Sequence, residues 1–99
     1  MKLDELLEGR RDRVIEIARA HGVKKMSAFG SFARGDARPD SDLDLLLMEY
    51  GPERTPWFPG GLIYDLEELL GRRVDVTTPD SIPLRIRERV LAEAVDVEG

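Results

Sequence analysis

The stretch FGSFARGDARPDSDLDLLL, residues 29–47, decides the fold of this chain. It starts at the end of an apolar run, turns at Gly30 and Ser31, crosses a polar segment rich in Gly, Arg and Asp, and opens a second apolar run with Asp42 and Asp44. Side chains two residues apart on a strand share one face and lie roughly 6.5–7 Å apart. The two aspartates are therefore expected to project together, while the leucines between and beyond them point to the opposite face.

The paired aspartates predict a cation site. Two carboxylates at the end of a buried strand repel each other and lose hydration, and Mg²⁺ binds hard carboxylate oxygens together with substrate phosphates. The Gly30-Ser31 turn can offer backbone N–H groups and a hydroxyl to such phosphates. Arg34 lies in the same stretch and is a further candidate for phosphate contact. These residues favour metal-assisted phosphoryl or nucleotidyl transfer.

The composition narrows the class of protein. The sequence has 99 residues, which predicts one domain over residues 1–99, and it has no cysteine, which fits a reducing compartment. A net charge of −5 argues against a broad nucleic-acid surface. No apolar run approaches the roughly 20 residues of a membrane span, and the acidic N-terminus does not suggest a signal peptide. We expect a cytoplasmic protein with no membrane contact and no direct nucleic-acid contact.

Hydrophobic periodicity and turn residues predict the order of elements. We expect helices at residues 10–20 and 62–70, a short helix at 32–36 capped by Ser31, strands at 23–29, 42–48 and 72–78, and a possible edge strand at 94–97. A last helix is expected to carry an apolar side made of Ile82, Leu84, Ile86, Val90 and Leu91. The fold class is α+β: an α/β sandwich with a small mixed sheet, flanking helices on one side, and carboxylates at one edge.

Two residues outside this framework have structural interpretations. His21, the only histidine, is expected to cap the end of the first long helix. Trp57 and Phe58 lie in a long loop over residues 49–61 that is rich in Gly and Pro. That loop either folds its aromatic side chains back over the core or exposes them as an anchor for a partner chain.

Asp75 is a third candidate carboxylate. It lies between Val74 and Val76 in a predicted strand, so alternation places it on the face opposite both valines. A carboxylate at such a position needs a partner charge or a metal ion. A purely structural alternative gives each carboxylate a local role: Asp42 capping a turn, Asp44 paired with Arg34 or Arg38, and Asp75 paired with Arg72 or Arg73.

The combined pattern resembles a known family. Gly-Ser ends a strand, ten residues follow, Asp-x-Asp opens the next strand, and a lone Asp stands in a later strand; the residues are Gly30, Ser31, Asp42, Asp44 and Asp75. This is similar to the minimal nucleotidyltransferases of the DNA polymerase β-like superfamily, over nearly the whole chain. The resemblance implies the nucleotidyltransferase fold.

The resemblance also implies roles for these residues. Asp42 and Asp44 would bind two Mg²⁺ ions, and Asp75 would share the catalytic metal and help to deprotonate the acceptor hydroxyl. Gly30 and Ser31 would hold the β- and γ-phosphates of ATP.

The function implied by the resemblance is that of an antitoxin. Such a protein would transfer AMP from ATP to a hydroxyl, on a tyrosine, of a partner HEPN-domain ribonuclease toxin, with which it would form a hetero-oligomer. Two alternatives stay open. One is a non-catalytic nucleotide-binding antitoxin that neutralises its partner by complex formation, and the other is a nucleotidyltransferase acting on a small hydroxyl compound.

Overall fold

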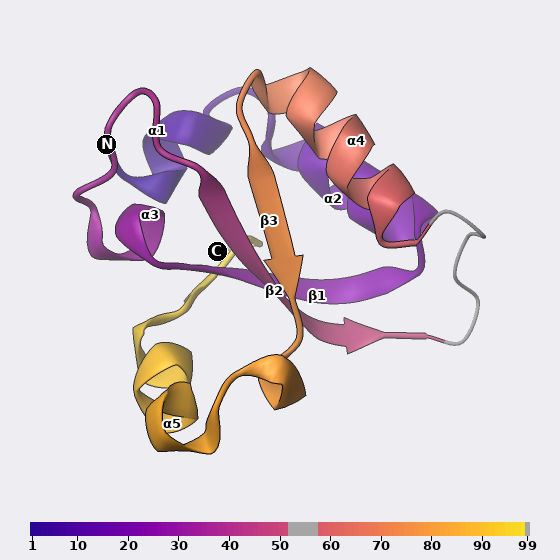
Figure 1. The fold of residues 1–99 in the computed structure, drawn as a ribbon. Helices are drawn as coiled ribbons and strands as arrows, with labels where there is room; N and C mark the ends of the chain where they lie inside the picture. Colours follow the sequence, from indigo (N-terminus) through magenta and orange to yellow (C-terminus); the bar gives the residue numbers. More distant parts are fainter. Residues whose placement is uncertain (52–57, 99) are drawn as a thin grey trace.

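The computed structural model describes residues 1–51 and 58–98 (Figure 1). Its elements in chain order are α1 (Leu3–Leu7), α2 (Arg11–Ala20), β1 (Val23–Phe29), α3 (Ser31–Arg34), β2 (Leu43–Tyr50), α4 (Gly60–Leu70), β3 (Val74–Thr77), the 3₁₀ turn η1 (Pro79–Ser81), α5 (Leu84–Glu93) and β4 (Val95–Asp96). The predicted order of helices and strands is confirmed, and so is the predicted α+β class.

The described strands form one mixed sheet in the order β3-β2-β1-β4. β1 pairs antiparallel with both β2 and β4, whereas β2 and β3 are parallel. The edge strand expected near the C-terminus is β4. Because β2 and β3 run in the same direction, their first residues lie side by side at one end of the sheet.

Helices cover both faces of the sheet, so the expectation that they lie on one side was wrong. Figure 1 shows α2 and α4 together on one side of the strands and α5 on the other. Leu45 and Leu47 of β2 belong to the core that includes Leu62 and Leu66 of α4. Leu46 points to the second face and is also fully buried, because η1 contacts β2 there. A strand that is apolar on both faces needs cover on both.

The turn before α3 differs from the sequence prediction. Ser31 was expected to cap the short helix, but it is the first residue of α3, and Gly30 is the capping residue. No side chain caps α3. The reason is that the chain enters the helix through the positive φ of Gly30, which leaves Ser31 inside the first turn.

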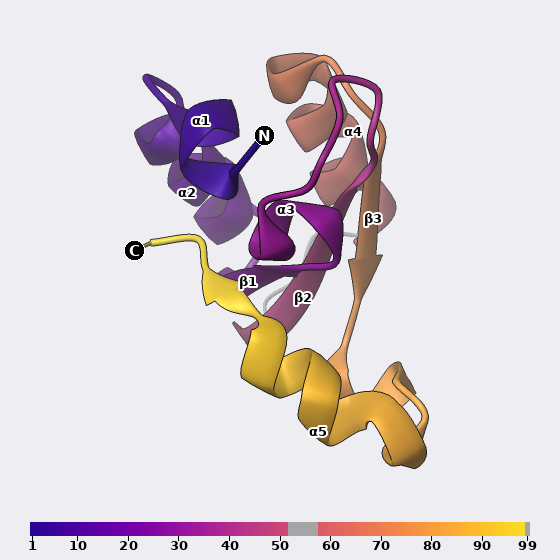
Figure 2. The ribbon, with the colours of Figure 1, turned by 90° about the vertical axis from the view of Figure 1, so that its left-hand side faces the viewer.

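The last helix buries fewer apolar side chains than expected. Ile82 is buried, but it precedes α5, and no residue of α5 itself is buried. Leu84 is 79% exposed, contrary to the expectation that it faces the core. Figure 2 shows that α5 extends beyond the sheet, with its first turn at the end of the helix that lies away from the strands.

The aromatic loop is described only in part. Trp57 lies outside the described residues. Phe58 packs against the core, and its ring centroid is 6.1 Å from that of Tyr50. For Phe58 this favours the interpretation in which the loop folds its aromatics back over the core. None of the helices in the described part of the chain has the length and apolar character needed to span a membrane.

His21 lies at the C-cap of α2, as expected. Its backbone N–H donates to the carbonyl of Ala18 at 3.1 Å. Its Nε2 lies 2.8 Å from Oδ2 of Asp65 on α4. The histidine therefore joins the end of one helix to the next helix of the same layer.

We expect two leucine-to-alanine substitutions to differ sharply in their effect on stability. Leu66→Ala removes a fully buried side chain from α4 and should lower the free energy of unfolding by about 2–5 kcal/mol. Leu84→Ala is the matched control and should change it by less than about 0.5 kcal/mol, because the side chain is exposed. Urea unfolding followed by circular dichroism measures both. Equal losses would contradict the placement of α5.

Candidate active site

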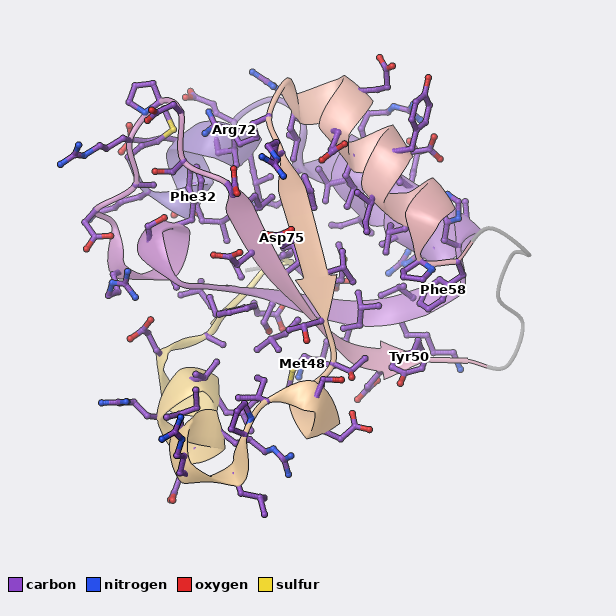
Figure 3. The ribbon with its side chains drawn as sticks, viewed as in Figure 1. Phe32, Met48, Tyr50, Phe58, Arg72 and Asp75 are labelled. Atoms are coloured by element: carbon purple, nitrogen blue, oxygen red, sulfur yellow. The ribbon has the colours of Figure 1, made fainter. Side chains whose placement is uncertain are left out.

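Asp44 and Asp75 are neighbours across the parallel strand pair. Their Cα atoms are register partners, between the pairs Leu43–Val74 and Leu45–Val76. The flanking residues Leu43, Leu45 and Val74 are buried, so alternation directs both aspartates to the second face of the sheet. Asp75 is exposed on β3, where Figure 3 labels it, and Asp44 is partly buried.

Asp42 lies directly before β2 rather than inside it. The next residue, Leu43, donates its N–H to the carbonyl of Arg73 at 2.9 Å, which ties this part of the chain to the start of β3. Burial raises the pKa of Asp44, and the negative charges of Asp75 and then Asp42 raise it further. The three carboxylates predicted from the sequence therefore lie within electrostatic reach of one another.

The Gly30-Ser31 turn lies against Asp44. Phe29, the last residue of β1, is the register partner of Asp44. Gly30 has φ +74°, and a Cβ added to it would lie 2.7 Å from Oδ2 of Asp44. Only glycine permits both this backbone conformation and this approach. The predicted phosphate-binding turn and the predicted cation ligands are thus brought together.

The local-pairing alternative does not agree with the contacts. Within residues 1–51 and 58–98, none of the three aspartates forms an ion pair. Arg34 contacts Asp36 and Glu93 instead, and Arg72 donates to the backbone carbonyl of Ser41. The turn before β2 is closed by Ser41, whose Oγ accepts from the N–H of Arg38, and not by Asp42.

Arg34 lies at the last position of α3, one helical turn after Gly30. Its backbone N–H donates to the carbonyl of Gly30 at 3.1 Å. The positive charge of Arg34 lowers the pKa of Asp44, partly opposing the carboxylates. The guanidinium is therefore close enough to act on the site, and its role in phosphate binding stays a prediction.

Arg72 is a positioning residue that sequence reasoning missed. Its guanidinium carbon lies 5.1 Å from the ring centroid of Phe32, and its Nη1 donates to the Ser41 carbonyl at 2.9 Å. These contacts join the start of β3, the helix α3, and the connector that precedes Asp42. Because the three segments are far apart in sequence, no local pattern could reveal the contact.

The three carboxylates are suitable ligands for a divalent cation. Carboxylate oxygens are the ligands that Mg²⁺ prefers, and a cation would relieve the mutual repulsion that raises the pKa of Asp44. Among the described residues, no three His, Cys, Asp or Glu side chains are already gathered into a cation cage. Asp42, Asp44 and Asp75 would therefore have to turn toward a bound ion.

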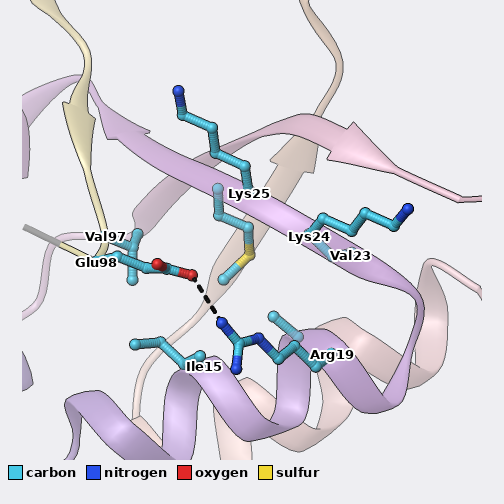
Figure 4. Close-up of a pocket in the computed structure, with 9 residues that line it drawn as sticks. Ile15, Arg19, Val23, Lys24, Lys25, Val97 and Glu98 are labelled. Atoms are coloured by element: carbon cyan, nitrogen blue, oxygen red, sulfur yellow. Dashed lines mark ion pairs between the residues drawn. The ribbon is translucent and has the colours of Figure 1, made fainter.

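The small cavity beside α2 is not part of this site. It lies between α2 and β1, has a volume of about 10 Å³, and is bordered by the Arg19–Glu98 ion pair at 3.6 Å (Figure 4). That volume holds about one water molecule. A nucleotide cannot enter it.

The fold and the site together define the class of protein. Residues 11–97 match the family described as the nucleotidyltransferase domain, and the chain belongs to this family. A solved structure described as a "putative minimal nucleotidyltransferase" superposes with a TM-score of 0.77 at 44% identity, covering 96% of this chain and 95% of that one. The resemblance to the minimal nucleotidyltransferases is confirmed.

Two relatives are closer in sequence than most of the structural neighbours. The chain is 45% identical over 85 residues to a Methanocaldococcus jannaschii protein named "putative protein adenylyltransferase", covering 86% of this chain and 90% of that protein. It is 39% identical over 83 residues to protein adenylyltransferase MntA of Thermococcus cleftensis, and the match covers 83% of this chain and 82% of that protein. A crystal structure described as a toxin-antitoxin with AMP-PNP shares the fold, with a TM-score of 0.70 at 18% identity, covering 89% of this chain and 72% of that one.

We expect Gly30→Ala to destabilise the protein more than a matched substitution does. Both Gly30 and Gly9 have positive φ, +74° and +75°, so alanine is strained at either position, and most at Gly30, whose ψ of −146° lies close to a region that only glycine populates. A Cβ on Gly9 meets nothing within 4 Å, whereas one on Gly30 meets Asp44. Thermal unfolding should show the larger fall in Tm for Gly30→Ala. Equal falls would show that the contact with Asp44 is not a constraint.

We expect Asp44→Asn to stabilise the metal-free protein at neutral pH. Because the pKa of Asp44 is raised above its ordinary 3.8, the folded state favours the protonated carboxyl, and that stability is lost as the pH rises through the raised pKa. Removing the charge should raise stability at pH 7 by about 0.2–1 kcal/mol, the size of a partly screened charge pair. That corresponds to roughly 1–8 °C in Tm.

The gain should shrink as the pH falls toward 3.8, where Asp44 becomes neutral in the wild-type protein as well. Asp40→Asn, a substitution at an exposed residue of the preceding turn, is the control and should change the stability at pH 7 by less than about 0.5 kcal/mol. Thermal unfolding in EDTA across this pH range measures both variants. A loss of stability at pH 7 in Asp44→Asn would show that its carboxylate is well paired in the folded state.

Proposed function

We propose that this chain is a Mg²⁺-dependent protein adenylyltransferase that acts as an antitoxin. It transfers AMP from ATP to a tyrosine hydroxyl of a partner HEPN-domain ribonuclease toxin, with release of pyrophosphate, and so neutralises the toxin. The observation that carries the proposal is the position of Gly30 against Asp44, with Asp75 beside Asp44 in the parallel register. The names of the two relatives support adenylyl transfer to protein.

The residues have distinct roles in this proposal. Asp42 and Asp44 hold two Mg²⁺ ions, and Asp75 helps to hold one of them and to accept the proton of the acceptor hydroxyl. Gly30, Ser31 and Arg34 bind and orient the phosphates of ATP. Bound divalent ions supply charge stabilisation to the attacking and leaving oxygens of an in-line displacement.

The exposure of the site supports a macromolecular acceptor. Asp75 is exposed at the surface of β3, so a side chain of another protein can reach it. A small hydroxyl compound would need walls to hold it, and this open position favours a protein instead. The HEPN identity of the partner and the tyrosine acceptor rest on the family resemblance. We also propose that residues 1–99 act as one domain in a hetero-oligomer with that partner.

We expect transfer to depend on Asp75. The protein is incubated with ATP labelled at the α-phosphate, Mg²⁺, and a HEPN-domain ribonuclease from the same organism. The wild-type protein should label the partner, and Asp75→Asn should lower the rate about 100-fold or more, since it removes a group that acts on the reacting oxygens. Asp80→Asn, an exposed aspartate five residues later, is the control and should keep the wild-type rate.

The same experiment separates the alternative function. If the wild-type protein blocks the ribonuclease activity of the partner but leaves no label on it, the proposed transfer is wrong. The protein would then neutralise its partner by binding alone. Label on the partner that persists in Asp75→Asn would show that the catalytic residue is misassigned.

A further inference from the structure

Arg34 is held by two carboxylates from different parts of the chain. Its Nε lies 3.3 Å from Oδ2 of Asp36, which is two residues away and belongs to the same turn. Its Nη1 lies 3.0 Å from Oε1 of Glu93, which is 59 residues away at the end of α5. Asp36 moves with Arg34, whereas Glu93 comes from a separate element. The Nη1 side of the guanidinium is therefore occupied by a group that can leave independently.

The position of Glu93 is unfavourable for its own helix. It is the last residue of α5, where the carbonyl ends of the helix are already partially negative. A carboxylate there is not explained by helix stability. Its one described polar contact is Arg34, so the contact between α3 and α5 accounts for its placement. Figure 2 shows the C-terminal end of α5 below α3.

Arg34 is accessible to an anion from solution. Its side chain is 50% exposed. It also acts electrostatically on Asp44, so it lies within reach of the candidate active site. A phosphate oxygen makes the same charge-assisted contact with a guanidinium as a carboxylate oxygen does. Glu93 and a nucleotide phosphate can thus compete for one donor.

We propose that Glu93 is an internal substitute for a nucleotide phosphate on Arg34. Nucleotide binding displaces the Glu93 side chain and loosens the contact between α5 and α3, while the pairing of β4 with β1 still holds the chain after α5. This inference rests on the proposed function, because it assumes that the site binds a nucleoside triphosphate. Residues of α5 are at most half-buried, so the ion pair is one of the few contacts that hold the helix near α3. Glu93 therefore sets the nucleotide affinity and couples the nucleotide to α5.

The test is a set of nucleotide affinities measured by calorimetry with ATP. Glu93→Gln removes the competing charge and should tighten ATP binding roughly two- to fivefold, the effect expected of an exposed ion pair. Arg34→Gln should weaken binding about tenfold or more, because a charge-assisted contact is lost. In the double variant, Glu93→Gln should no longer tighten binding, since the shared donor is absent.

Glu88→Gln is the matched control. It makes the same change of charge on an exposed residue of the same helix and should leave the ATP affinity unchanged. Equal tightening in Glu88→Gln and Glu93→Gln would overturn the inference, because it would indicate a general electrostatic effect. An unchanged affinity in Glu93→Gln would overturn it as well. If the wild-type protein binds no ATP, the proposed function fails together with it.

Hydrogen exchange in α5 gives an independent measurement, because a merely structural ion pair would not make this exchange respond to ATP. ATP should speed amide exchange in α5 of the wild-type protein. In Glu93→Gln, exchange in α5 should already be fast and should not respond to ATP. An α5 that becomes more protected when ATP binds to the wild-type protein would overturn the proposed displacement.

Discussion

The close approach of Gly30 to Asp44 is the constraint on which the rest of the site depends. The antiparallel register of β1 and β2 places Phe29 opposite Asp44, so the turn that follows must pass directly over the carboxylate. A Cβ at Gly30 would lie 2.7 Å from Oδ2 of Asp44, so only glycine fits. The parallel pairing of β2 with β3 then adds Asp75 to the same face. Two strand pairings therefore bring the Gly30-Ser31 turn, Asp44 and Asp75 together, and Asp42 follows from its place directly before β2.

The three aspartates repel one another, and this repulsion does not stabilise the fold. Asp44 is partly buried beside two other carboxylates, and its pKa is raised for that reason. Arginine side chains lie nearby, but Arg34 and Arg72 are held by other groups. A neutralising ion pair for each aspartate would have been a simpler structural solution. Groups left in conflict with their surroundings are typical of functional sites, in keeping with the cation and nucleotide that we propose for this one.

The sequence predicts those features that depend on local pattern. β1 matches its predicted bounds, 23–29, because glycines at positions 22 and 30 delimit the apolar run, and alternation located Asp75 correctly on the open face. It does not predict features that depend on how distant segments meet. The exposure of Leu84, the second-face position of α5, and the contacts of Arg72 and Glu93 follow from the placement of α5 and β3 in space. The failed Ser31 cap is a local error, caused by the positive φ of the preceding glycine.

The central claim is that one cation-and-nucleotide site is built from the Gly30-Ser31 turn, Asp42, Asp44 and Asp75. Paramagnetic broadening of backbone amide signals by Mn²⁺, with ATP present and the protein labelled with ¹⁵N, tests it most directly because it locates the ion without requiring turnover. The account expects the amides of the turn and of these three aspartates to broaden first, and this effect to disappear in Asp44→Asn. Broadening centred on the acidic side chains carried by helices α2 and α4, with the Gly30 signal unaffected, would contradict this placement of the ion.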